Sequence, residues 1–181
     1  MDIYKSKFTQ LQEQVLRFLF VNVGKNFNQR SIAKNLDVSP TAISNSLSFL
    51  EKEDLIFVKK DKESQTLEIG LNLDNPEVFY LKRVENLRML YLSQLPLKLM
   101  QDFPGTTIVL FGSYSLGEDR YNSDIDIAII GVKEKNLDLR GFEKIFFKKI
   151  VVQFYPNFRE IHKNLKESIL NGIVLKGSVE I

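Results

Sequence analysis

Residues 111–130 read FGSYSLGEDRYNSDIDIAII, in which a Gly-Ser pair is followed ten residues later by Asp-Ile-Asp at the start of an apolar run. The preceding run, TTIVLF at 106–111, is β-branched and apolar, and both runs are typical of short buried strands. Because successive residues of a strand alternate faces, Asp124 and Asp126 are expected on one face and the isoleucines that follow each of them on the other.

Two carboxylates side by side repel each other, which raises the pKa of one of them, and a divalent cation relieves that repulsion. Mg²⁺ in particular is bound by one or two carboxylates together with substrate phosphates. Gly112 at the end of a strand lets the backbone approach a ligand, and Ser113 offers a hydroxyl and backbone N–H groups to an anion. The stretch therefore indicates a nucleoside triphosphate held on a metal. The alternative is an ordinary turn and strand edge.

The spaced pattern resembles the nucleotidyltransferase superfamily that includes DNA polymerase β and the aminoglycoside nucleotidyltransferases, and most of all its minimal, mostly prokaryotic members. The likeness runs from about Thr106 to the last residue. It implies a small mixed sheet with flanking helices, and a reaction in which an acceptor hydroxyl attacks the α-phosphate and pyrophosphate leaves. Carried over, Asp124 and Asp126 are catalytic ligands of Mg²⁺ or Mn²⁺, while Gly112 and Ser113 hold the β- and γ-phosphates, with ATP the expected nucleotide.

One departure from this family concerns a third carboxylate on a later strand, where the chain reads KKIVVQFYP at 148–156 and we predict Gln153 at the matching position. A neutral glutamine weakens the metal that would activate the acceptor and removes a proton acceptor. The nearby acids Glu143 and Asp138 are expected on the surface of the preceding helix. Nucleotide binding is therefore expected to survive this change better than transfer does.

The first third of the chain carries a different pattern. Apolar residues recur at helical spacing in FTQLQEQVLRFLFVN, residues 8–22, and a second helix is predicted over 29–36 with Asn28 as its N-cap. After a short turn, Ser39 caps a third helix that has Pro40 in its first position. Two helices joined so tightly are a helix-turn-helix.

Two β-like runs, IFVKK and TLEIGLN, follow and predict a hairpin, or wing. The stretch QRSIAKNLDVSPTAISNSLSFLEKEDLI, residues 29–56, resembles winged helix-turn-helix domains of DNA-binding regulators. This resemblance implies that the third helix enters the major groove of double-stranded DNA while the wing lies near phosphates. The implied contacts are Thr41, Ser44, Asn45 and Ser48 near bases, and Lys59, Lys60 and Lys62 near phosphates.

Charge gives this DNA-binding interpretation little support. Residues 1–75 hold ten Lys or Arg and ten Asp or Glu, whereas contacts to phosphates usually dominate the affinity for DNA. A dimerisation or protein-docking role of the winged helix stays open as the alternative.

The whole chain is predicted to be an α+β protein. It divides into a winged helix-turn-helix domain at 1–74, connecting helices at 75–104 and a minimal nucleotidyltransferase domain at 105–181. The connecting helix carries Val84, Leu87, Tyr91 and Leu95 at helical spacing before Pro96 breaks it. Such a stripe is either core or the pairing surface of a homodimer.

The composition narrows the chemistry further. With no cysteine and one histidine, the chain lacks the residues for thiol catalysis, Cys-ligated zinc or a His-based metal site. His162 is expected to face solvent on a helix at 158–170. MDIYKSKFTQ at the start has no apolar core of a signal, so we expect a cytoplasmic protein with no membrane segment.

Two functions are consistent with these patterns. The first is metal-dependent transfer of a nucleotide monophosphate to a hydroxyl acceptor. Only a helix and the strand-like IVLK follow Gln153, so the acceptor is expected to be brought by the winged helix, a second protomer or a protein partner. The second function is a catalytically weakened regulator that binds a nucleotide, a partner or DNA, for example as the antitoxin of a toxin-antitoxin pair.

Overall fold

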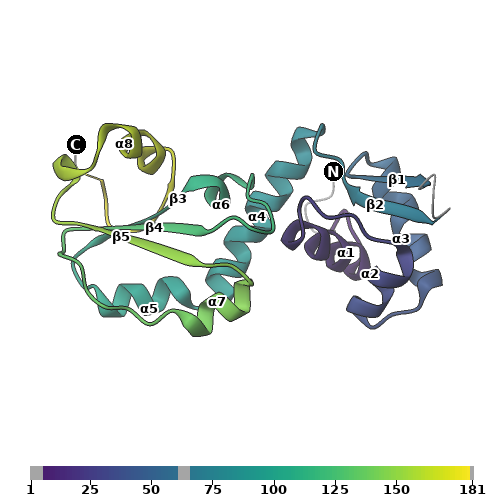
Figure 1. The fold of residues 1–181 in the computed structure, drawn as a ribbon, viewed down its shortest axis with the longest axis horizontal. Helices are drawn as coiled ribbons and strands as arrows, with labels where there is room; N and C mark the ends of the chain where they lie inside the picture. The colour runs from purple at the N-terminus through teal and green to yellow at the C-terminus, as the bar shows by residue number, and fades with distance from the viewer. Residues whose placement is uncertain (1–5, 61–65, 180–181) are drawn as a thin grey trace. The chain divides into compact units, whose positions relative to one another are not determined.

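The computed structural model describes residues 6–60 and 66–179, and the chain divides into two compact units, Met1–Phe79 and Tyr80–Ile181 (Figure 1). The division falls inside helix α4, Pro76–Leu92. Most of the segment predicted to connect two domains, 75–104, therefore makes its contacts within the second unit. The fold is α+β, with the helix-rich unit first and a mixed sheet in the second.

Side-chain caps set where the three helices of the first unit begin. These helices are α1 (Gln10–Val21), α2 (Gln29–Leu36) and α3 (Pro40–Lys52). Asn28 accepts a hydrogen bond from the backbone N–H of Ser31 at 2.8 Å, and Ser39 accepts one from that of Ala42 at 3.2 Å. Both predicted caps are confirmed, as is Pro40 as the first helical residue.

The wing follows α3 directly. Strands β1 (Ile56–Lys60) and β2 (Leu67–Leu71) pair antiparallel, from Ile56 opposite Leu71 to Lys60 opposite Leu67. Phe27, between α1 and α2, exchanges two backbone hydrogen bonds with Ile69 at 2.8 and 2.9 Å, which ties the helices to the wing. Three helices, a tight α2–α3 turn and a hairpin make this unit a winged helix-turn-helix.

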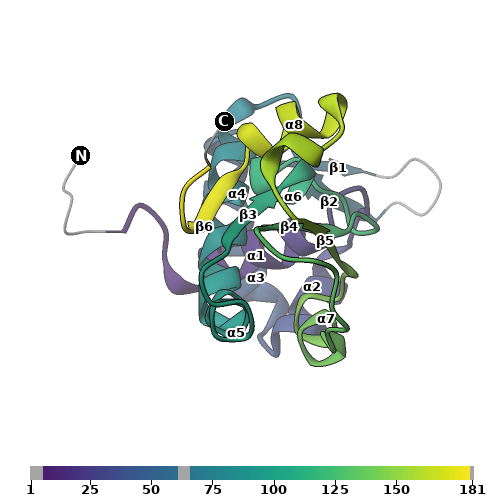
Figure 2. The same ribbon diagram turned by 90° about the vertical axis from the view of Figure 1, so that its left-hand side faces the viewer.

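The second unit is built on a four-stranded sheet of order β5-β4-β3-β6. Its strands are β3 (Thr107–Phe111), β4 (Ile125–Ile130), β5 (Ile150–Tyr155) and β6 (Ile173–Lys176). β4 and β5 are parallel and the other pairs are antiparallel, so the sheet is mixed as predicted. Helices α5 (Leu95–Asp102) and α7 (Arg140–Phe146) lie on one side of it and α8 (Lys163–Leu170) on the other (Figures 1 and 2).

Alternation along β4 supplies both cores of this unit. Ile125, Ile127 and Ile129 are fully buried in the cluster that includes side chains of α5 and α7. Ala128 and Ile130 face the other cluster, which includes Phe158 and Ile169. The predicted division of faces is confirmed, and it puts Asp126 on the α8 side of the sheet.

The last predicted helix, 158–170, is in fact two elements. A 3₁₀ turn spans Phe158–Glu160 and α8 begins at Lys163, with His162 exposed at the N-cap position. Among the described residues, no helix is both long and apolar enough to cross a membrane.

Helix α4 shows that the predicted apolar stripe is not core along its whole length, and the homodimer surface stays a prediction. Val84 and Tyr91 are 65% and 53% exposed, while the buried positions, four residues apart, are Val78, Lys82, Asn86 and Leu90. Leu95 belongs to α5, because the chain turns at Gln94, where φ is +64°. Pro96 is thus the second residue of a new helix and does not bend α4. The buried face of α4 thus includes two polar side chains, Lys82 and Asn86.

Candidate active site

Asp126 lies in β4 opposite Phe111, the last residue of β3, and opposite Val151 of β5. Asp124 comes two residues earlier, immediately before β4, and is exposed, whereas Asp126 is half-buried. The alternation of the strand places both side chains toward the same side of the sheet. The two predicted carboxylates therefore lie at one end of β4, where β3 ends.

Gly112 lies directly against the Asp126 carboxylate. Its φ is +72°, in the left-handed region, and a Cβ atom on it would collide with Oδ2 of Asp126. The Ser115 hydroxyl donates a hydrogen bond to the Gly112 carbonyl at 2.7 Å, which fixes this peptide. Ser113, half-buried, is the second residue of the short helix α6 (Gly112–Leu116). Only glycine fits this position without displacing the carboxylate.

Partial burial raises the pKa of Asp126, and the neighbouring charge of Asp124 raises it further. Both effects disfavour the ionised carboxylate. A divalent cation bound between the two residues would reverse this preference because it attracts both negative charges. The pair has the oxygen ligands that Mg²⁺ or Mn²⁺ takes. Asp124, Asp126 and Ser113 could hold such a cation together with a phosphate.

The register of β5 shows which residue lies beside Asp126, while Gln153 as the third-ligand position stays a prediction. Val151 is the residue opposite Asp126, and Gln153 lies opposite Ala128, about 6.6 Å further along the strand. The side-chain oxygen of Gln153 accepts a hydrogen bond from the Tyr155 hydroxyl at 2.5 Å. The place beside Asp126 on this strand is therefore aliphatic.

No other carboxylate fills this place. Glu143 accepts a hydrogen bond from the Ile150 backbone N–H at 3.1 Å and so caps the start of β5. Asp138 pairs with Arg140 at 2.7 Å in an exposed position. Within residues 6–60 and 66–179, no three His, Cys, Asp or Glu side chains gather in a way that would hold a metal ion. The candidate site thus has two carboxylates.

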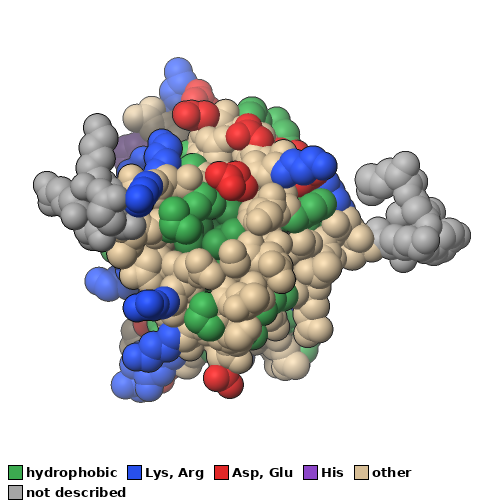
Figure 3. Space-filling model, turned by 90° about the vertical axis from the view of Figure 1, so that its right-hand side faces the viewer, with side chains coloured by type: hydrophobic (Ala, Val, Ile, Leu, Met, Phe, Trp, Pro, Cys, Tyr) green, Lys and Arg blue, Asp and Glu red, His purple; other side chains and the backbone are tan. Residues whose placement is uncertain are grey.

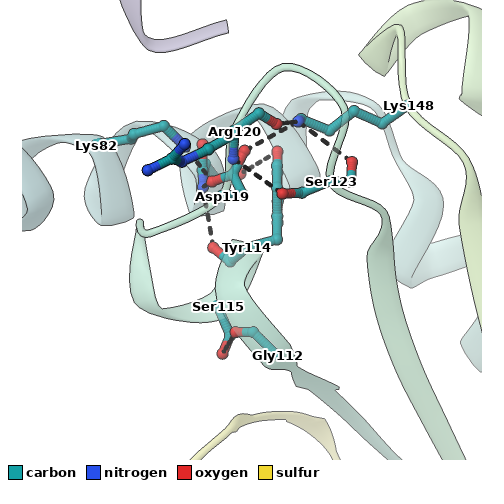
Figure 4. Close-up of polar contacts among 9 residues, drawn as sticks. Lys82, Gly112, Tyr114, Ser115, Asp119, Arg120, Ser123 and Lys148 are labelled. Carbon is teal, nitrogen blue, oxygen red and sulfur yellow. Dashed lines mark hydrogen bonds and ion pairs between the residues drawn. The ribbon is translucent and has the colours of Figure 1, made fainter. Parts of the chain in front are cut away.

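Sequence reasoning missed a buried ionic cluster beside this site. Asp119, 1% exposed, accepts contacts from the ammonium groups of Lys82 and Lys148, the latter at 3.1 Å. Asn86 donates a further hydrogen bond to Asp119 at 2.7 Å and another to the Tyr114 carbonyl at 2.9 Å. Figure 4 shows Asp119 between the two lysines. Because Lys82 and Asp119 are 37 residues apart, no local sequence pattern predicts this contact.

The cluster also holds the loop that leads to Asp124. Lys148 Nζ donates to the carbonyl of Arg120 and, at 3.3 Å, to that of Ser123 (Figure 4). The same two residues close a turn, with Ser123 N–H donating to the Arg120 carbonyl at 3.1 Å and Arg120 N–H to the Ser123 hydroxyl at 2.9 Å. Since Ser123 immediately precedes Asp124, this turn positions the first carboxylate of the pair.

Two ammonium groups share one carboxylate in this cluster. Burial lowers the pKa of Lys82, and the attraction of Asp119 opposes that shift without cancelling it. The ammonium groups of Lys82 and Lys148 therefore both depend on the negative charge of Asp119.

The predicted DNA-contacting residues of α3 share one exposed face. Thr41, Ser44, Asn45 and Ser48 are all exposed, as are Lys59 and Lys60 at the end of β1. Lys62 lies outside the described residues. Several Lys and Arg side chains gather along the left edge of the face shown in Figure 3.

Residues 92–176, which include the sheet and both carboxylates, match the family model described as a nucleotidyltransferase domain. These residues are a nucleotidyltransferase domain. The Gly-Ser pair, Asp124 and Asp126 lie inside the match, and Lys82 and Asn86 lie before it. The nucleotidyltransferase domain therefore receives part of its buried cluster from a helix that begins outside the family match.

Solved structures with some likeness to the chain are winged-helix regulators. A mutant of MepR from S. aureus is 27% identical over 40% of this chain and 53% of its own, with a TM-score of 0.37. A MepR–DNA complex from the same organism is 24% identical over 52% and 77%, with a TM-score of 0.40. A mutant of ZitR from Lactococcus lactis is 21% identical over 57% and 67%, with a TM-score of 0.42.

This chain therefore spans about half the length of the first of these structures. With TM-scores this low, the similarities add nothing to the winged-helix assignment, which rests on the helices and hairpin described above. No curated protein matches the sequence of the chain.

Replacing Gly112 by alanine tests the contact with Asp126. We expect Gly112→Ala to cost about 1–2 kcal/mol of stability from the left-handed backbone, and to abolish Mg²⁺-dependent nucleotide binding because the new methyl group displaces the carboxylate. Gly105→Ala is the matched control, since φ there is +78° and its Cβ would meet nothing within 4 Å. Thermal unfolding and calorimetric titration with Mg·ATP measure the two effects. Equal ATP binding by both variants would contradict the prediction.

The ionic cluster predicts an asymmetry between its members. Asp119→Asn leaves two buried ammonium groups without a counter-charge and is expected to cost about 3–5 kcal/mol, the usual penalty for breaking a buried pair. Lys82→Met leaves Asp119 paired with Lys148 and should cost clearly less. Urea unfolding measures the free energy of unfolding of both variants. Equal losses of stability would contradict the view that the two positive charges depend on Asp119.

Proposed function

We propose that the nucleotidyltransferase domain binds a nucleoside triphosphate on Mg²⁺, or Mn²⁺ in its place, with Asp124 and Asp126 as metal ligands. Gly112 and Ser113 then lie along the β- and γ-phosphates, and ATP is the first nucleotide to test. The observation that carries this proposal is the close approach of the Gly112 backbone to the Asp126 carboxylate. That contact puts the backbone of the Gly-Ser pair next to a proposed metal ligand, so a phosphate on the same metal would lie close to its N–H groups.

The reaction supported by this site is transfer of a nucleotide monophosphate to a hydroxyl acceptor. The acceptor oxygen forms a bond to the α-phosphorus while the bond from that phosphorus to the bridging oxygen breaks and pyrophosphate leaves. We propose that the hydroxyl proton passes to water, because Val151, opposite Asp126, has no group that accepts a proton. A missing general base costs about 10²–10⁴-fold in rate, so we propose slow transfer on a well-formed nucleotide site.

An α-phosphate-labelled ATP experiment in native lysate with Mg²⁺ tests both parts. Wild type is expected to label an acceptor slowly, and Asp126→Asn to label nothing. Val151→Asp puts a carboxylate beside Asp126 and is expected to raise the rate by about 10²-fold or more. Gln153→Asp is the matched control, because its carboxylate would lie opposite Ala128, and it should leave the rate unchanged.

Two results would count against this function. Labelling by folded Asp126→Asn would remove the metal site from the mechanism. If no variant labels an acceptor and calorimetry detects no binding of Mg·ATP, the nucleotide site is wrong and a protein-docking role is favoured.

A second function, binding of double-stranded DNA by the winged helix, is favoured by the exposed polar face of α3 beside Lys59 and Lys60. Such a protein would be a regulator that couples nucleotide binding to a DNA site. The small charge of the unit means that few phosphates would be neutralised, so binding should be modest and salt-sensitive.

Fluorescence anisotropy with labelled random and promoter DNA measures this directly. Lys60→Ala is expected to weaken binding and reduce the slope of log affinity against log salt by about 0.9, the value for one phosphate contact on B-form DNA. Lys163→Ala removes the same charge from the exposed start of α8 in the other unit, and it should change neither the affinity for DNA nor the salt slope. Identical slopes for the wild type and Lys60→Ala would take this lysine out of the interface, and no binding at low salt would exclude the function.

A further inference from the structure

Phe147 is the most exposed large hydrophobic side chain among the described residues, at 81%. It ends helix α7 with a backbone in the left-handed region, φ +53° and ψ +32°. This conformation is where helices most often carry glycine, and a bulky residue is disfavoured in it. A phenylalanine here has both an exposed ring and an unfavourable backbone.

The other non-glycine residues described with positive φ are Asp37, Asp54 and Gln94. All three are polar, and short polar side chains are the usual exceptions in this region. All four side chains are exposed, and Phe147 differs from the other three because it is large and apolar. Residues held in this way concentrate at sites where the side chain has a task outside the fold.

The neighbours of Phe147 explain why its ring points outward. Phe146 is buried and packs edge-on against Tyr114, with ring centroids 6.2 Å apart. Lys148 is buried in the ionic cluster with Asp119. The side chains on both sides of Phe147 are buried, and the Phe147 side chain between them is left exposed to solvent.

The backbone of Phe147 lies at the same end of the sheet as the metal-ligand pair. Lys148, the next residue, reaches the carbonyl of Ser123 at 3.3 Å. Lys149 accepts a hydrogen bond from the backbone N–H of Ile125, between the two carboxylates, at 2.9 Å. The backbone of residues 147–149 thus runs beside that of residues 123–125.

We propose that Phe147 is a stacking platform for the nucleobase of the nucleotide whose triphosphate Asp124 and Asp126 hold through the metal. This inference rests on the function proposed above and names the residue that binds the other end of the same ligand. An exposed aromatic ring beside a phosphate site offers a face to any of the bases, because every base has a π-face. Phe147 therefore contributes affinity for nucleotides without choosing strongly between them.

The full-length chain is titrated with Mg·ATP and, as a probe without a base, with Mg·tripolyphosphate. Phe147→Gly relieves the backbone and removes the ring, so we expect unchanged or higher thermal stability together with a loss of ATP affinity of about tenfold or more. Tripolyphosphate affinity should not change. Phe147→Trp is expected to restore ATP binding.

Gln94→Gly is the matched control, because it relieves a left-handed backbone at φ +64° between α4 and α5 and removes no aromatic ring. It should leave both affinities unchanged. Unaltered ATP binding by Phe147→Gly, or equal loss of ATP and tripolyphosphate, overturns the stacking role. A wild type that binds neither probe overturns the nucleotide site itself, and the stacking role with it.

Discussion

The candidate site depends on one buried carboxylate, Asp119, and on the two lysines that balance it. A charge removed from water is tolerated only when it is paired and hydrogen-bonded. Here Lys82 comes from α4 and Lys148 from the start of β5, so the loop between α6 and β4 is attached to two separate elements. Because this loop ends at Asp124, the position of a proposed metal ligand follows from electrostatics in the protein interior.

The proposed site has two sides, one for the phosphates and one for the acceptor. On one side, Gly112 contacts the Asp126 carboxylate and its carbonyl is fixed by Ser115. On the other, β5 is aligned by Glu143 and its register places Val151 beside Asp126. The residues proposed to hold a nucleotide therefore come together, whereas β5 offers no carboxylate beside Asp126. This division explains why binding and turnover must be measured separately.

The sequence predicted what depends on neighbouring residues. The caps Asn28 and Ser39 and the opposite faces of Asp126 and Ile127 follow from local hydrogen bonds and strand alternation, and all are found. The choice between Val151 and Gln153 could not be made in this way, because residues two apart in a strand share a face and only the pairing with β4 distinguishes them. Likewise, Lys82 on α4 pairs with Asp119, 37 residues away, and helical periodicity does not predict such a contact.

The buried polar face of α4 also bears on how this unit acquires its structure. Lys82 and Asn86 must be in place before Asp119 can be enclosed, so the loop before β4 cannot settle on the basis of the sheet alone. Closing a contact over so long a stretch of chain delays its formation relative to local helices and turns. Strands β3 and β4 are close in the sequence and can pair early, whereas the pairing of β3 with β6 and the docking of α4 close longer stretches of chain. The smallest autonomous form of this site therefore has to start before Lys82, well upstream of the first strand.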